Sequence, residues 1–115
     1  MEQEDFLKEN ISEFMRQAER SSKEEDYNPA ATLFFKAIVV TVDYIILKKE
    51  GYIPNNHNDR FLILKNKYPH LYDILDKDFP LYQKTSSLRS TKEQVRILEK
   101  DAKRIIEESG IEKDN

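Results

Sequence analysis

The chain of 115 residues is long enough to form one domain with its own hydrophobic core. It has no cysteine, which excludes a disulfide framework and thiolate chemistry, and only 2 glycines and 4 prolines, which favours helices over a sandwich or barrel. The net charge of −3 is uneven: residues 1–26 are acidic and residues 27–88 mildly basic, which supports phosphate binding only weakly.

The first predicted helix covers about residues 3–23. Its apolar residues Leu7, Ile11, Phe14 and Ala18 follow the spacing of one helical face. Acidic residues at its start suit the helix dipole. A polar run over 21–26 ends it. The acidic start of the chain lacks the basic and apolar regions of a signal peptide, so we expect a cytoplasmic protein.

Residues 28–50 form the most apolar stretch and predict a central helix. Asn28 is a suitable N-cap, Pro29 suits the first helical position, and Gly51 can end the helix. The stretch is apolar around most of its circumference, as expected of a helix buried by others. Lys36 and Asp43 interrupt it and no second apolar segment exists, so burial in a core is favoured over a membrane span.

Two shorter helices are predicted next. The first covers about 57–67, capped by Asn56 or Asn58. The second opens with Pro69 and covers about 69–78, where Phe79-Pro80 is expected to break it.

The last predicted helix starts at a capping box, Ser90-Thr91-Lys92-Glu93. Its buried stripe consists of Val95, Leu98, Ala102 and Ile105. Ser109-Gly110 should end it, and 111–115 should fray. The predicted fold is therefore a single all-α domain over 1–115, an up-and-down bundle of four or five helices.

Few residues could carry chemistry. The best cluster is His57, Asp59 and Arg60 at the head of the third helix, with Arg89 near the last. His and Arg together can bind phosphate and move protons, as cleavage of RNA requires. The alternative is structural: His57 caps a turn, while Arg60 and Arg89 tie helix ends together. Metal-ligand spacing is lacking around both histidines, so no metal or cofactor is expected.

Asp43 in the central helix has two interpretations. It could serve as a buried catalytic acid, or it could lie on a polar seam and pair with a neighbour such as Lys36. The structural interpretation is favoured.

From about Ala30 to Ile106 the chain resembles the HEPN family of small helical proteins. The features that carry the resemblance are Ala30-Ala31, Phe34-Phe35-Lys36-Ala37, Asp43-Tyr44-Ile45-Ile46-Leu47, the turn Lys49-Glu50-Gly51-Tyr52-Ile53-Pro54, Asn56-His57, Leu81-Tyr82 and Leu88-Arg89. The resemblance implies an antiparallel bundle that is usually dimeric, and often a toxin paired with a minimal nucleotidyltransferase. It also makes His57, Arg60, Arg89 and Lys49 the candidate residues for binding nucleotide or RNA.

Active members of the family resemble metal-independent ribonucleases, with an Arg followed about four to six residues later by a His that acts in proton transfer. Arg89 takes the place of that Arg, but no His follows His70. The expectation is therefore a non-catalytic module for interaction or for binding nucleotide or nucleic acid. A divergent ribonuclease built from His57, Arg60 and Arg89 is one alternative, and a purely structural protein-interaction bundle is the other.

A homodimer is also expected. One stripe of the central helix mixes polar and apolar residues: Thr32, Lys36, Val39, Asp43 and Ile46. A two-fold axis could bury this stripe against itself, with Lys36 of one chain against Asp43 of the other.

Overall fold

The computed structural model describes residues 2–113, and every regular element in this range is helical. The five α-helices are α1 (Glu2–Lys23), α2 (Tyr27–Glu50), α3 (His57–Lys67), α4 (Pro69–Gln83) and α5 (Lys92–Ser109), with 3₁₀ turns at Lys84–Ser86 and Ile111–Lys113. The prediction of an all-α helical bundle is confirmed.

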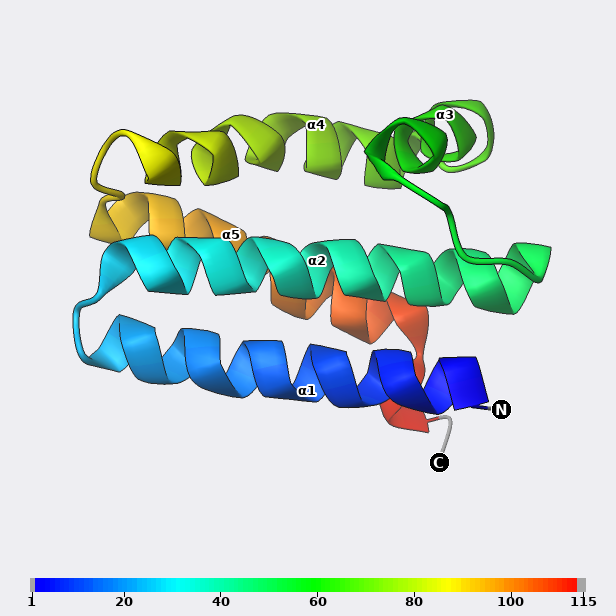
Figure 1. Cartoon of the computed structure of the whole chain (residues 1–115), viewed down its shortest axis with the longest axis horizontal. Coiled ribbons are helices and arrows are strands. Elements are labelled where there is room, and N and C mark those ends of the chain that lie inside the picture. Colours follow the sequence, from blue (N-terminus) through cyan, green and yellow to red (C-terminus); the bar gives the residue numbers. More distant parts are fainter. Residues whose placement is uncertain (1, 114–115) are drawn as a thin grey trace.

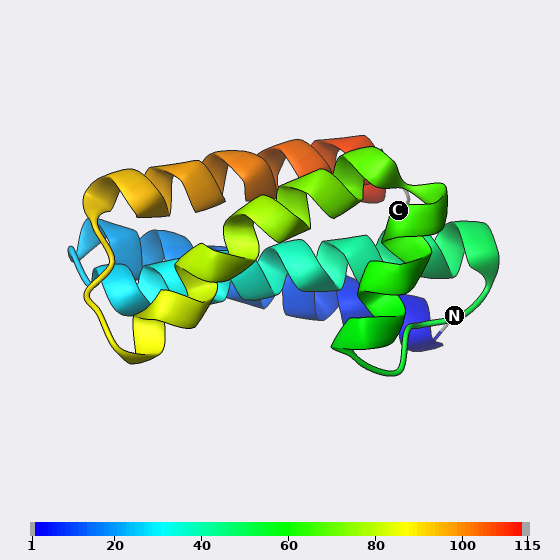
Figure 2. The ribbon, with the colours of Figure 1, turned by 90° about the horizontal axis from the view of Figure 1, so that it is seen from above.

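Four long helices run up and down, and the short α3 lies across one end of them (Figures 1 and 2). The central helix α2 packs against α1, α5 and α4. Among its buried side chains, Phe34, Ile38 and Ile46 are fully shielded from solvent. By length and composition α2 could also cross a membrane. However, 72% of its most apolar 18-residue stretch is buried inside the protein, as in the core helix of a bundle.

The start of α2 differs from the prediction. The helix begins at Tyr27, so Asn28 lies inside its first turn and is not the N-cap. The Asn28 side chain instead donates to the carbonyls of Thr85 and Leu88 and accepts from the backbone N–H of Ser90, joining α2 to the α4–α5 connection. At the other end Gly51 adopts φ 88° and ends the helix, as predicted.

The predicted break at Phe79-Pro80 is wrong, because α4 continues through Pro80 to Gln83. An interior proline removes one helical hydrogen bond, so the last turn must be held by packing. Phe35 of α2 supplies such contacts, stacking on Tyr82 with ring centroids 4.8 Å apart and meeting Phe79 at 6.0 Å.

The N-terminal caps of α3 and α5 can be compared with the predictions. Asn56 is the cap of α3, accepting from the backbone N–H of Asp59 at 2.9 Å. The capping box of α5 lies one residue later than predicted, at Thr91 and Gln94, because the N–H of Ser90 is taken by Asn28.

The predicted fraying is wrong for 111–113. Ile111 is buried beside Leu7, Ile11 and Ile106, and this apolar contact holds the final 3₁₀ turn against the bundle. The rest of the predicted frayed segment, residues 114 and 115, lies outside the described range.

Candidate functional site

The head of α3 is fixed by a buried ion pair with α2. Arg60 Nε donates to Asp43 Oδ1 at 2.7 Å, and Arg60 Nη2 donates to Asp43 Oδ2 at 2.9 Å. Asp43 is 7% exposed and Arg60 9% exposed. The partner of Asp43 is therefore Arg60, whereas the predicted partner Lys36 is exposed. Burial raises the pKa of the Asp43 carboxyl, while the two hydrogen bonds from Arg60 act in the opposite direction.

His57 completes this network. Its Nδ1 lies 2.8 Å from Arg60 Nη1. Because a guanidinium only donates hydrogen bonds, Nδ1 must accept, which places the ring proton on Nε2. Burial, followed by the charge of Arg60, lowers the pKa of His57, so the ring is neutral at neutral pH.

Aromatic rings close around the imidazole. The His57 ring meets Phe61 of α3 at 5.1 Å and Phe79 of α4 at 4.9 Å between centroids. Its Nε2 is buried and has no hydrogen-bond partner. Neither ring nitrogen is thus presented to a substrate: one accepts from Arg60 and the other faces the protein interior.

The remaining predicted nucleotide-binding residues do not join this network. Arg89 is exposed in the connection between α4 and α5, which lies at the end of the bundle opposite α3 (yellow in Figures 1 and 2). Lys49 lies at the end of α2 with its Nζ 5.6 Å from the centre of the Tyr68 ring. Asp59 is exposed. The predicted binding residues are therefore spread over the two ends of the molecule.

The predicted dimer stripe does not form one exposed face of the single chain. Asp43 and Ile46 are buried, with Ile46 fully shielded, and Thr32 is half-buried with its hydroxyl donating to that of Thr85 at 3.3 Å. Val39 packs partly against the core, and Lys36 alone is well exposed.

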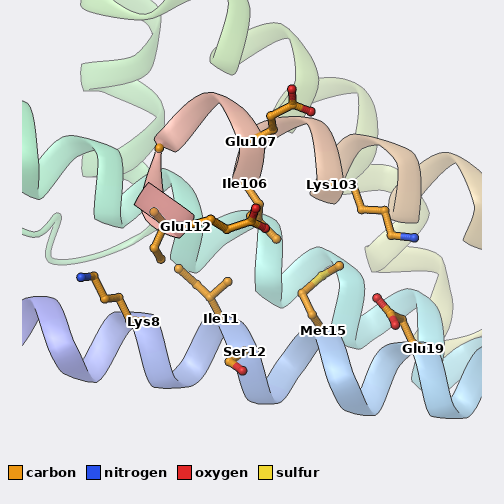
Figure 3. A pocket seen from close by; sticks show the side chains of 11 residues that line it. Lys8, Ile11, Ser12, Met15, Glu19, Lys103, Ile106, Glu107 and Glu112 are labelled. Carbon is orange, nitrogen blue, oxygen red and sulfur yellow. The ribbon is translucent and has the colours of Figure 1, made fainter. Parts of the chain in front are cut away.

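A groove that the sequence interpretation missed runs between α1 and α5 (Figure 3). Its volume is about 960 Å³, and its lining combines apolar Ile11, Met15, Ile106 and Ile111 with charged Lys8, Glu19, Lys103, Glu107 and Glu112. It forms because α1 and α5 each pack extensively on α2, which leaves a furrow between them. A signal was present in the sequence: residues 8, 12, 15 and 19 share a helical face next to the apolar stripe.

The second histidine lies at the surface, away from this network. His70 is exposed, and its Nε2 lies 2.5 Å from Glu108 Oε1. Within residues 2–113, no three His, Cys, Asp or Glu side chains converge so that they could hold a metal ion.

Comparison with known proteins adds no assignment: no family model, no curated protein and no solved structure matches this chain. The HEPN resemblance stays a prediction.

Proposed function

We propose that this chain is a non-catalytic, HEPN-like interaction module that binds a helix in the groove between α1 and α5. The single observation that carries the proposal is the groove itself, with its apolar floor and its rim of both charge signs. A furrow of this kind, flanked by two helices, fits the apolar face of a third helix.

The occupant we propose is α1 of a second copy, which keeps the homodimer expected from the sequence but moves its interface. Along the groove, α1 presents Lys8 near one end and Glu19 near the other, with Ser12 and Met15 between them. An antiparallel copy of α1 centred between Ser12 and Met15 places Lys8 of each chain opposite Glu19 of its partner. The contact is isologous, so this favourable pairing occurs twice.

The network at the head of α3 supports a non-catalytic role. A general acid or base must reach the reacting atoms with a titratable nitrogen, and both nitrogens of His57 are engaged or enclosed. Arg60 is held by Asp43, and Arg89 belongs to the opposite end of the bundle. These features speak against the ribonuclease alternative built from His57, Arg60 and Arg89.

The partners implied by the HEPN resemblance, a nucleotidyltransferase and a nucleotide or RNA, remain predictions. Of the candidate residues, only Arg89 and Lys49 are exposed, and Lys49 lies over the Tyr68 ring. Neither belongs to the groove, so binding of such a partner would use another surface and could coexist with the dimer.

Two measurements test the proposed function. In a mixed dimer of isotope-labelled and unlabelled chains, we expect NMR contacts between the two chains at Ser12, Met15 and Ile106 and none along α3. Contacts between chains confined to α3, or none at all, would contradict the groove. In parallel, purified protein should leave single-stranded RNA intact; cleavage that disappears in both His57→Ala and Arg89→Ala would establish the enzyme alternative instead.

A further inference from the structure

Two acidic side chains that the proposed function does not use meet in the interior. Asp78 of α4 is fully buried, and Asp101 of α5 is 6% exposed. Both oxygens of Asp78, and Oδ2 of Asp101, are buried without a hydrogen-bond donor from the described residues. In Figure 2, α4 runs at an angle to α5 and comes closest to it toward the C-terminal end of α5, where the two helices are in contact.

Among the described residues, one cation approaches the pair. Lys77 Nζ lies 3.0 Å from Asp101 Oδ2, without hydrogen-bond geometry, and 3.8 Å from Asp78 Oδ1. More than half of the Lys77 side chain is in solvent, so its charge is well hydrated. One cation can balance one carboxylate, which leaves the second buried negative charge without compensation.

We propose that Asp78 and Asp101 share one proton near neutral pH, and that this proton is a pH-sensitive latch between α4 and α5. A protonated carboxyl donates to the neighbouring carboxylate, which joins the two helices and removes the uncompensated charge. In agreement, burial raises the pKa of Asp78 to about 8, and the neighbouring Asp101 carboxyl contributes to the same shift. Asp101 and Lys77 are the charged groups that act on Asp78, and Lys77 opposes the shift.

A proton fits this position better than a metal ion. Cations such as Ca²⁺ take about six to eight oxygen ligands and need space for them. No third acidic or histidine side chain joins the pair within residues 2–113.

The latch has a defined pH response. In the unfolded chain Asp78 has an ordinary pKa, so between about pH 4 and pH 8 the folded state binds one proton more than the unfolded state. Its stabilising effect is fully present below about pH 4 and is lost as the pH rises through about 8. Above this range two adjacent negative charges repel each other across α4 and α5.

The decisive comparison is urea unfolding of wild type and Asp78→Asn at a series of pH values. Asn keeps the shape and can donate to Asp101, but has no proton to lose. Between about pH 5 and pH 8 we expect the unfolding equilibrium constant of wild type, relative to Asp78→Asn, to rise by up to about tenfold per pH unit. Asp76→Asn, which changes an exposed carboxyl of the same helix, should follow wild type.

A second measurement uses wild type alone, so it does not depend on whether a variant folds. Carbon-13 NMR of the aspartate carboxyls in wild type should show Asp78 losing its proton near pH 8, far above the range of ordinary aspartates. If both carboxyls of the pair are ionised at about pH 5, as ordinary aspartates are, the latch does not exist. Parallel pH profiles of wild type and Asp78→Asn would also overturn it.

Discussion

Arg60 and Asp43 are 17 residues apart in sequence and form a two-pronged ion pair inside the protein. The pair joins α3 to the central helix, and its third member, His57, accepts from the same guanidinium. The residues that most resembled catalytic groups in the sequence thus hold the short crossing helix in place.

Breaking this pair should be costly. Arg60→Met leaves the Asp43 carboxylate buried without its partner, and we expect a loss of about 3–5 kcal/mol in the free energy of unfolding. Replacing both partners, as in Asp43→Leu with Arg60→Met, should recover much of that loss because no charge remains buried. Urea unfolding measures both. A loss below about 0.5 kcal/mol for Arg60→Met, the size of an ordinary surface effect, would show that the pair is not buried in solution.

The neutral imidazole of His57 predicts weakening in acid. The pKa of His57 is lowered in the folded state. Just below about pH 6.5 the unfolded chain therefore binds more protons at this side chain than the folded chain does. The stabilising effect is therefore present above about pH 6.5 and is lost as the pH falls toward the folded pKa. Compared with wild type, His57→Asn should flatten this slope. Equal slopes in the two proteins would contradict the assignment.

Asn28 should matter more than a surface residue. Asn28→Ala removes the contacts to Thr85, Leu88 and Ser90 and leaves backbone groups of the α4–α5 connection without partners. We expect a loss of about 1–3 kcal/mol by urea unfolding. Gln17→Ala on the exposed face of α1 is the control and should change stability by less than about 0.5 kcal/mol. An Asn28→Ala protein as stable as this control would mean that the connection is held by other contacts.

The core assignment of α2 is tested by truncation. Phe34 and Ile38 are fully shielded, so Phe34→Ala or Ile38→Ala should each cost about 2–5 kcal/mol. Leu62→Ala on α3, where the side chain is 62% exposed, should cost much less. Similar losses at all three positions, measured by thermal or urea unfolding, would be incompatible with the observed packing.

Local signals in the sequence were sufficient for most of the fold. The apolar periodicity predicted the buried stripe of α5, and Gly51 predicted the end of α2. Both features depend only on residues that are close together in the sequence. The break at Pro80 was mispredicted because stacking of Phe35 on Tyr82 joins residues 47 positions apart, which no local pattern reveals. Asn28 was assigned as a cap for the same reason: its partners belong to the distant α4–α5 connection.

The candidate site was harder to predict than the fold. The sequence placed His57 and Arg60 on one helix head, but their partner Asp43 depends on how α3 crosses α2. The helical periodicity of residues 28–50 placed Ile46 on the same stripe as the exposed Lys36. In the structure, the helices around α2 cover Ile46 completely. Ile46→Glu would therefore disturb the core and cannot serve as a clean test of a dimer interface.

Sedimentation of charge-reversal variants at micromolar concentration tests the proposed interaction surface most directly. Wild type should sediment as a dimer. Lys8→Glu should be a folded monomer, because each copy then places Glu opposite Glu19 of its partner, and combining Lys8→Glu with Glu19→Lys should restore the dimer. Glu13→Lys, on a different and exposed face of α1, should remain dimeric. A monomeric wild type, or a dimer that survives Lys8→Glu unchanged, would contradict binding of α1 in the groove.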